Sequence, residues 1–357
     1  MLEYTYAACR CFDELCAAVR AREGAPPSFR EDAELCRHTD GKLAVIAQRL
    51  TESGLRIAAM GASCRPAGVR REGSLFHVRM MAILRMRFDD CPSYAEWGIP
   101  VACIFDSAAG RPVLLDWRSD DGIEEELAAR ACSSAQLCLR EAVRYEEQRV
   151  KAPSMRAAAQ AARYASGGRA LRPLDREGMR TYALENCSRV HPAGGAPGAV
   201  YFDFSTIPGN WDCTNFVSHA VLAGRAPMNK PYGGTGVRAE GWYFYSINDR
   251  SHSWSGVEPF YRFMTTNRAR GPQGEGMSFS AYREGDFAEI GDIIQLDHLG
   301  QEANGTWDHS TVVTGTAGRT IRVTWRTARG AYGRDIPLLL HYPFGAKRAI
   351  VLAGYRD

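Results

Sequence analysis

The chain has no long apolar run. None of its 357 residues lies in a stretch near the roughly 18 consecutive apolar residues that a membrane-spanning helix requires. Glu3, Asp13 and Glu14 interrupt the start of the chain, where a secretory signal would have a basic end and an unbroken apolar core. We therefore expect no membrane span and a cytoplasmic location.

A basic stretch is also missing. Residues 1–173 contain 25 Lys and Arg against 23 Asp and Glu, and residues 174–357 contain 19 against 18. No run of positive charge could follow nucleic-acid phosphates, which are spaced at one charge per roughly 1.7 Å of duplex. The composition excludes nucleic acid as the expected partner and assigns no oligomeric state.

Paired cysteines are missing as well. The chain has 11 cysteines, an odd number, and no CxxC pair. Cys9, Cys11 and Cys16 are close in sequence, but a zinc site needs a second group of ligands. We expect reduced thiols, no metal and no other cofactor. A metal or redox protein is the alternative, and it would contain stoichiometric zinc or iron.

The composition is that of a folded protein, with 45% hydrophobic and 24% charged residues, and the length suits two domains. The first domain is predicted at residues 1–150. A helical linker follows at 151–173, where an Ala- and Arg-rich stretch ends in glycines and Pro173. The second domain is predicted at 174–357.

The first domain is predicted to be α+β. Apolar residues recur at three- and four-residue steps in 1–22, and a second helix is expected at 40–53. Residues 122–164 are rich in helix formers. Four strands are predicted at residues 55–63, 75–88, 99–105 and 112–117. Helices followed by an antiparallel sheet make a small α+β unit of unknown role, with a cystatin-like or NTF2-like arrangement as a candidate.

The second domain is also predicted to be α+β. Short helices are expected at 174–187 and in the segment NWDCTNFVSHAVLAG, residues 210–224. Antiparallel strands are expected at residues 290–297, 307–315, 319–327 and 336–342. A helix that carries a cysteine and packs on an antiparallel sheet that carries a histidine is the layout of a papain-like site.

Cys213 is the candidate nucleophile. Asn210 or Asp212 can cap the helix, which places Cys213 in the first turn beside unpaired backbone N–H groups. A helix start can lower a thiol pKa from about 8.5 to roughly 3.5–7.5, and the N–H groups can stabilise an oxyanion. The alternative is a packed core thiol, but the neighbours Thr214 and Asn215 are polar.

His309 is the candidate base. It lies on a predicted strand in WDHSTVVTG, whereas His298 precedes a glycine-containing loop and resembles a solvated turn residue. His219 follows Cys213 by six residues, or about 240° around a helix, and cannot face the sulfur.

The residue that would orient the imidazole stays open. A hairpin after His309 would pair it with Arg326 or with Thr324, and both would then lie on its face of the sheet. A guanidinium has no acceptor for the imidazole N–H and lowers a histidine pKa. Thr324 or a carboxylate such as Asp297 is the alternative.

Five motifs occur in the order found in a known family. DCTNFVS, GWYFY, SHSWSGV, IGDIIQLD and WDHSTVVT lie at residues 212–218, 241–245, 251–257, 290–297 and 307–314. Together they resemble the putative amidase domain family, which is similar to papain-like, NlpC-type cysteine amidases and peptidases associated with bacterial cell-wall peptides. Residues 174–187 resemble the opening segment of that family, so the resemblance covers the last half of the chain.

The resemblance implies a peptide or amide substrate, Cys213 as nucleophile and His309 as base. It also implies a cell-envelope or secreted location as the alternative to the cytoplasm. Where the family usually has a second histidine before a threonine, this chain has Arg326. The candidate groove residues, which could equally be core residues, are Asp212, Asn215, Trp242, Trp254 and Trp307.

The sequence thus predicts a cysteine-dependent amide or peptide hydrolase. Cys213 would form a thioester that water hydrolyses, with His309 transferring the proton. A cysteine-dependent acyltransferase would use the same residues. A catalytically silent peptide-binding module is the second alternative, because Arg326 replaces the expected histidine.

Overall fold

The structure is a computed structural model of the chain. It describes residues 2–30, 32–52, 54–89, 91–108, 110–119, 171–189, 201–207, 210–279, 288–297, 307–317, 320–327, 330–341 and 347–357. The helix predicted at 122–164, most of the linker predicted at 151–173 and His298 lie outside these ranges. Within them, no helix combines the length and the apolar character that crossing a membrane requires.

The chain divides into two compact units. The first comprises Met1–Leu137 and Ala331–Ile336, and the second comprises Cys138–Gly330 and Pro337–Asp357. Both units combine helices with antiparallel strands, so the predicted α+β class is confirmed.

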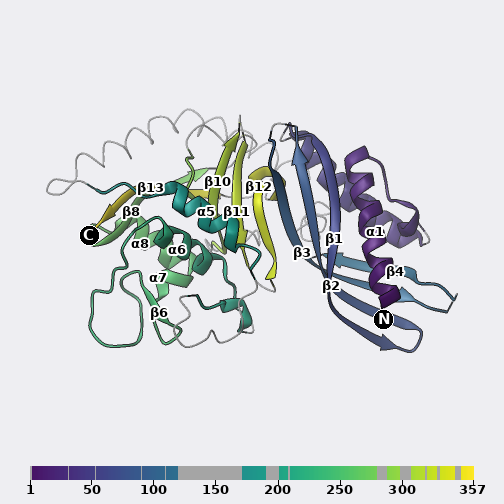
Figure 1. Ribbon diagram of the computed structural model, residues 1–357, viewed down its shortest axis with the longest axis horizontal. Coiled ribbons are helices and arrows are strands. Elements are labelled where there is room, and N and C mark those ends of the chain that lie inside the picture. Colours follow the sequence, from purple (N-terminus) through teal and green to yellow (C-terminus); the bar gives the residue numbers. More distant parts are fainter. Residues whose placement is uncertain are drawn as a thin grey trace. The chain divides into compact units, whose positions relative to one another are not determined.

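The first unit is an antiparallel meander with helices on one face (Figure 1). Strand β3 pairs with β2, β4 and β12, and β2 also pairs with β1. The elements are α1 (Leu2–Ala21), η1 (Pro27–Phe29), α2 (Ala33–Glu52), β1 (Ile57–Glu72), β2 (Leu75–Phe88), β3 (Tyr94–Asp106), β4 (Val113–Ser119) and β12 (Tyr332–Pro337).

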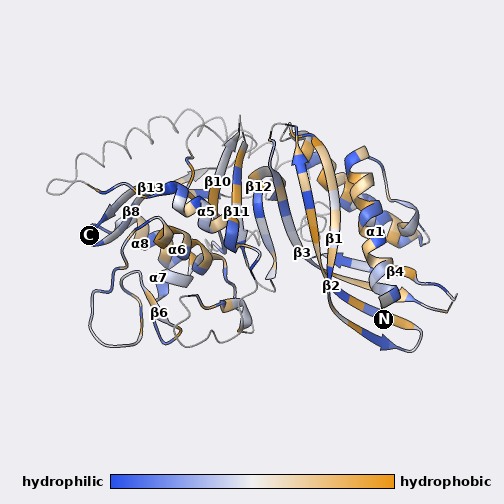
Figure 2. Cartoon of the chain, viewed as in Figure 1, coloured by the Kyte–Doolittle hydropathy of each residue, from blue (hydrophilic) through white to orange (hydrophobic). Residues whose placement is uncertain are grey.

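Aromatic contacts hold α1 on the sheet. Tyr4 stacks on Phe76 with ring centroids 3.8 Å apart, and Phe12 meets Trp117 edge-on at 5.7 Å. Hydrophilic and hydrophobic bands alternate along β2 (Figure 2), as expected for a strand with one covered face. The core of the first unit therefore lies between the helices and the face of the sheet that they cover.

The two helices and four strands predicted for residues 1–22, 40–53, 55–63, 75–88, 99–105 and 112–117 are present, with different bounds. The second helix begins at Ala33, and the first strand continues to Glu72. A register shift between Pro66 and Gly68 is the reason for the longer strand. A bulge can accommodate a proline that regular pairing excludes.

The second unit is built around the sheet β11-β10-β9-β13-β8, in which all neighbours are antiparallel. Its helices are α5 (Arg176–Asn186), η2 (Phe204–Thr206), α6 (Cys213–Ala223), α7 (His252–Ser255), α8 (Val257–Thr266) and α9 (Leu338–His341). Its strands are β5 (Val237–Arg238), β6 (Phe244–Ser246), β7 (Asp249–Ser251), β8 (Gly271–Phe279), β9 (Ile293–Leu296), β10 (His309–Ala317), β11 (Thr320–Arg326) and β13 (Lys347–Arg356).

A buried ion pair attaches α5 to the sheet. Asp292, fully buried, accepts a hydrogen bond from Arg176 at 2.9 Å. It also accepts the backbone N–H groups of Glu289 at 2.9 Å and Leu352 at 3.1 Å. Asp292 is therefore a structural turn residue that joins α5, β9 and β13.

One predicted strand is wrong. Residues 336–342 were expected to be extended, but Leu338–His341 form the short helix α9. A short run of leucines suits a buried strand or a buried helix equally well, so periodicity cannot distinguish them. The sequence also did not predict β8, whose glycine-rich residues GPQGEGMSF show no apolar alternation.

Candidate active site

Cys213 is the first residue of α6, as the sequence predicts. Phe216, Val217 and Ala220 are fully buried on this helix, which ends at Ala223 with Gly224 as its C-cap. Asp212 occupies the cap position, but its side chain makes no capping hydrogen bond. The Asp212 carboxylate instead binds Arg326, Tyr201 and the backbone of Phe204.

The Cys213 sulfur contacts the segment that carries His309. It lies 3.8 Å from the carbonyl oxygen of Asp308 and 3.8 Å from the Thr214 hydroxyl. The backbone N–H of Ser310 also donates a hydrogen bond to it, and the Thr214 and Ser310 hydroxyls are 3.0 Å apart. The first turn of α6 therefore lies against the start of β10.

The His309 ring points away from this contact. Its centroid is 5.5 Å from Trp325 and 5.5 Å from His341 of α9. The Ser310 hydroxyl faces α6, and successive side chains of a strand lie on opposite faces. Among the described residues, the contacts of the Cys213 sulfur do not include the His309 ring.

The Cys213 thiol is not a resting thiolate. Burial raises its pKa to about 11, although hydrogen bonds from the Ser310 N–H and the Thr214 hydroxyl act in the opposite direction. The residue is 3% exposed, and desolvation disfavours an anion more than these contacts favour it. The sequence-based expectation of a lowered pKa is therefore wrong for this state.

The predicted orienting residues lie on the other face of the sheet. Val312 pairs with Thr324, and the register shifts between Val313 and Gly315. This bulge adds one residue to β10, which moves Thr324 and Arg326 to the face opposite His309. Thr324 instead contacts the Thr314 hydroxyl at 2.9 Å. The prediction that Thr324 and Arg326 share the face of His309 is wrong.

Asp297 is buried and directly follows Leu296, the β9 partner of His309. Gln295, two residues before Asp297, donates a hydrogen bond to the Ser310 hydroxyl at 3.2 Å. Alternation along the chain places Asp297 on the side of Gln295, which is the α6 side.

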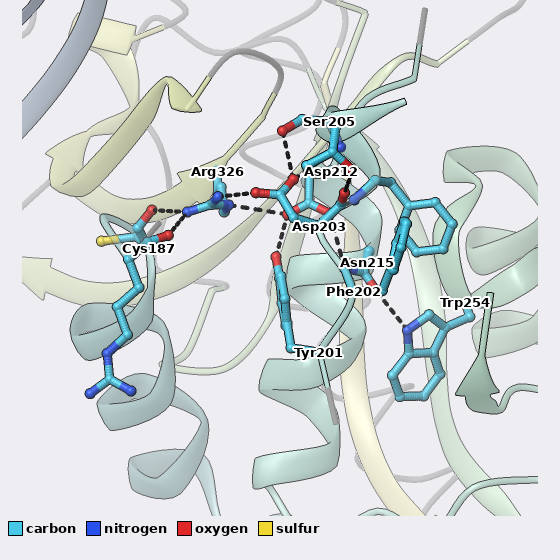
Figure 3. A network of polar contacts seen from close by, with 12 residues as sticks. Cys187, Tyr201, Phe202, Asp203, Ser205, Asp212, Asn215, Trp254 and Arg326 are labelled. Carbon is cyan, nitrogen blue, oxygen red and sulfur yellow. Dashed lines mark hydrogen bonds and ion pairs between the residues drawn. The ribbon is translucent and has the colours of Figure 1, made fainter. Parts of the chain in front are cut away.

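Arg326 is the centre of a buried ion cluster (Figure 3). Its guanidinium pairs with Asp203 and, at 3.1 Å, with Asp212. It also donates to the carbonyl oxygens of Cys187, at 3.3 Å, and Arg189. Arg326 is 3% exposed. Its donors therefore hold the chain together around the start of α6.

Asp212 is the shared acceptor of this cluster. Besides Arg326, it accepts the Tyr201 hydroxyl, the backbone N–H of Phe204 at 3.0 Å and the Asn215 amide at 3.0 Å. Burial and the neighbouring charge of Asp203 raise the pKa of Asp212 to about 6. Two carboxylates share one guanidinium, and the cluster carries an excess of negative charge near neutral pH.

This arrangement predicts a pH dependence of stability. The pKa of Asp212 is about 6 in the folded chain against 3.8 for an ordinary carboxyl. Stability from this group is present below pH 3.8 and is lost as the pH rises through about 6. The shift corresponds to at most about 3 kcal/mol. Urea unfolding across this pH range should show a smaller pH slope for Asp212→Asn than for the natural chain, and equal slopes would contradict the assignment.

Most predicted groove residues are core residues. Trp242 and Trp254 are fully buried with ring centroids 4.8 Å apart. Trp242 donates to the Ser218 hydroxyl at 3.1 Å, and Trp254 donates to Asn215 at 2.8 Å. With Asp212 and Asn215 also fully buried, the interpretation of these four residues as a surface groove is wrong.

Two other aromatic residues lie on the two chain segments that meet at the thiol. Trp211 is 41% exposed and precedes Cys213 by two residues. Trp307, half-buried, lies under the Arg348 guanidinium at 4.6 Å and precedes Asp308. Trp211 was not predicted from the sequence as a site residue, although it directly precedes the Asp212–Cys213 pair. The contact between the sulfur and Asp308 brings these two segments together.

Comparison with known proteins identifies the region. Residues 173–336 match a family described as "Putative amidase domain", which confirms the resemblance of these residues to that family. The chain is 28% identical over 146 residues to "Uncharacterized protein YhbB" of Bacillus subtilis (strain 168). The match spans 41% of this chain and 38% of that protein. No solved structure matches the chain significantly.

Proposed function

We propose that the second unit is a cysteine-dependent amide hydrolase with Cys213 as its nucleophile. One observation carries the proposal: the thiol at the start of α6 contacts the backbone on both sides of His309. This contact lies inside the region that matches the amidase family.

The thiol must lose its proton during the attack. Because its pKa is about 11, the neutral thiol is the resting form at pH 7. The sulfur attacks the carbonyl carbon while His309 takes the proton, and the imidazolium then protonates the leaving amine. Water hydrolyses the thioester and restores the thiol.

The first N–H groups of α6 supply positive charge for this step. The early backbone N–H groups of a helix have no carbonyl partner within the helix. The N–H of Cys213 is thus suited to stabilise the oxyanion that forms when the sulfur attacks.

The site requires a movement of His309. Its ring lies against Trp325 on the face opposite α6, so the backbone at this first residue of β10 must change conformation to bring the ring to the sulfur, which already contacts Asp308. Arg326 takes no part in the proton transfer, because its donors are engaged by two carboxylates and two carbonyl oxygens.

A peptide is the proposed substrate. Trp211 and Trp307 can provide aromatic contact area on the two chain segments that meet at the thiol. Peptides of the cell-wall type and a location in the cell envelope are the finer part of this proposal, and they rest on the resemblance of the five motifs alone.

Trapping the thioester tests this function. The chain is incubated with a panel of N-acetylated peptide amides, quenched in acid and digested, and the peptides are weighed by mass spectrometry. We expect amine release and an acyl adduct on the peptide that contains Cys213. Added glycinamide separates the two reactions, since an acyltransferase would form the new amide. Amine release without an adduct on Cys213 contradicts the proposal.

A silent binding module is the second candidate. It is favoured by the protonated thiol and by the turned His309 ring. In the same assay it would bind peptide amides without releasing amine.

A further inference from the structure

The free edge of β1 in the first unit has an unprotected half. Among the described residues, β1 pairs with β2 alone, so its other edge presents backbone N–H and C=O groups. Residues 65–72 carry Arg65, Pro66 and further charges, which discourage pairing with another strand. Residues 57–63, with the sequence IAAMGAS, have no charge and no proline.

The strand register places arginines beside this half of the edge. On the face away from α1, Arg85 of β2 lies between Gly61 of β1 and Glu96 of β3. Arg334 of β12 is the next residue in the same row, opposite Glu96. In the adjacent row, Arg87 lies opposite Tyr94 of β3.

These charges do not balance. Arg85 pairs with Glu96 at 2.8 Å, and the Tyr332 hydroxyl also donates to that carboxylate. Burial acts to raise the pKa of Glu96, but these two donors outweigh it and hold the pKa below its usual value. Glu96 is therefore ionised, with Arg85 and Arg334 beside it. In these two rows, three arginines accompany one carboxylate.

A pocket of about 620 Å³ lies at the same place. Residues 59–63 of β1 line one side, and Ile83, Arg85, Tyr94, Glu96 and Arg334 line the rest. Consecutive strand residues point to opposite faces. A pocket lined by five consecutive residues must therefore extend along the strand edge as well as over the face.

We propose that the first unit binds an extended acidic peptide, which adds a strand to the free edge of β1 at residues 57–63. Its backbone would pair with the exposed N–H and C=O groups, and its carboxylates would meet Arg85, Arg87 and Arg334. Strand addition provides affinity through main-chain hydrogen bonds, and neighbouring pockets select the side chains. The excess of positive charge selects acidic side chains.

A designed peptide tests the site on the full chain. The probe is a fluorescein-labelled peptide of alternating glutamate and valine, about eight residues long, whose binding is followed by anisotropy at about 50 mM salt. We expect saturable binding that weakens with salt. A probe with lysine in place of glutamate should bind at least tenfold more weakly. Equal binding of the two probes overturns the proposal.

Two glycines of β1 offer a matched pair of variants. Gly61 has no atom within 4 Å of an added Cβ, so Gly61→Glu fits without strain and places a carboxylate in the pocket opposite Arg85. We expect at least tenfold weaker binding. Gly68→Glu adds the same charge on the same face outside the pocket, where the nearest atom is a terminal nitrogen of Arg79 at 3.7 Å. The affinity of Gly68→Glu for the acidic probe should stay within about twofold of the natural chain. Equal losses of affinity in both variants would contradict the proposed site.

Two further measurements complete the test. Arg334→Ala should weaken binding about tenfold, and Cys213→Ala should leave it unchanged, because the site does not depend on the proposed hydrolase. If sedimentation instead shows a dimer that Gly61→Glu dissociates, and the acidic probe does not bind, a second copy of the chain occupies the edge and the peptide proposal is wrong.

Discussion

Replacing Cys213 with alanine is expected to lower kcat/KM for amide hydrolysis by about a thousandfold or more. Loss of a nucleophile removes the covalent intermediate, and what remains is the binding and charge stabilisation that the rest of the site provides. The measurement is amine release from the peptide amide that the natural chain hydrolyses fastest. Cys213→Ala removes a small buried side chain at a helix start, so the fold should persist.

Cys187 provides the matched control. It is another fully buried thiol of the second unit, at the end of α5, and it holds Arg326 through its backbone carbonyl. Cys187→Ala keeps that carbonyl and should leave kcat/KM within about threefold of the natural chain. Comparable losses in both variants would show that packing, not nucleophilic attack, explains the effect.

Replacing Arg326 with methionine is expected to destabilise the second unit by about 3–5 kcal/mol. Methionine retains much of the side-chain volume but leaves the Asp203 and Asp212 carboxylates buried without their cation. An uncompensated buried charge costs far more than a lost surface contact. Chemical denaturation at pH 7.5 measures the change.

A chain without the two buried carboxylates separates the effect of charge on stability from the effect of packing. In a chain that also carries Asp203→Asn and Asp212→Asn, Arg326→Met should cost much less, because no buried carboxylate is left unpaired. Arg180→Met is the surface control, as Arg180 pairs with the exposed Glu177 at 3.1 Å, and it should change stability by less than about 1 kcal/mol. An Arg326→Met effect as small as this one would contradict the role of the cluster.

Several features could be predicted because they depend on near neighbours in the chain. The apolar stripe and Gly224 define α6, and Cys213 is its first residue as expected. The motif order led to the amidase family, which the comparison confirms for residues 173–336.

Other features depend on contacts between distant residues. The bulge between Val313 and Gly315 reverses the face of everything that follows on β10 and β11, and no local pattern announces a one-residue shift. From the sequence, Arg326 was interpreted as a residue that could prevent catalysis. Its partner Asp203 lies 123 positions away in the chain, so the sequence did not reveal the pairing. Only folding shows that Asp203 and Asp212 neutralise it.

By itself, the sequence determined where the nucleophilic sulfur of this chain can be, because helix periodicity, capping residues and motif order are properties of short segments. The tertiary structure alone decided the protonation of that sulfur, the direction of the His309 ring and the role of Arg326. Each of these depends on desolvation and on charges from remote segments, and water is excluded only once those segments have packed together.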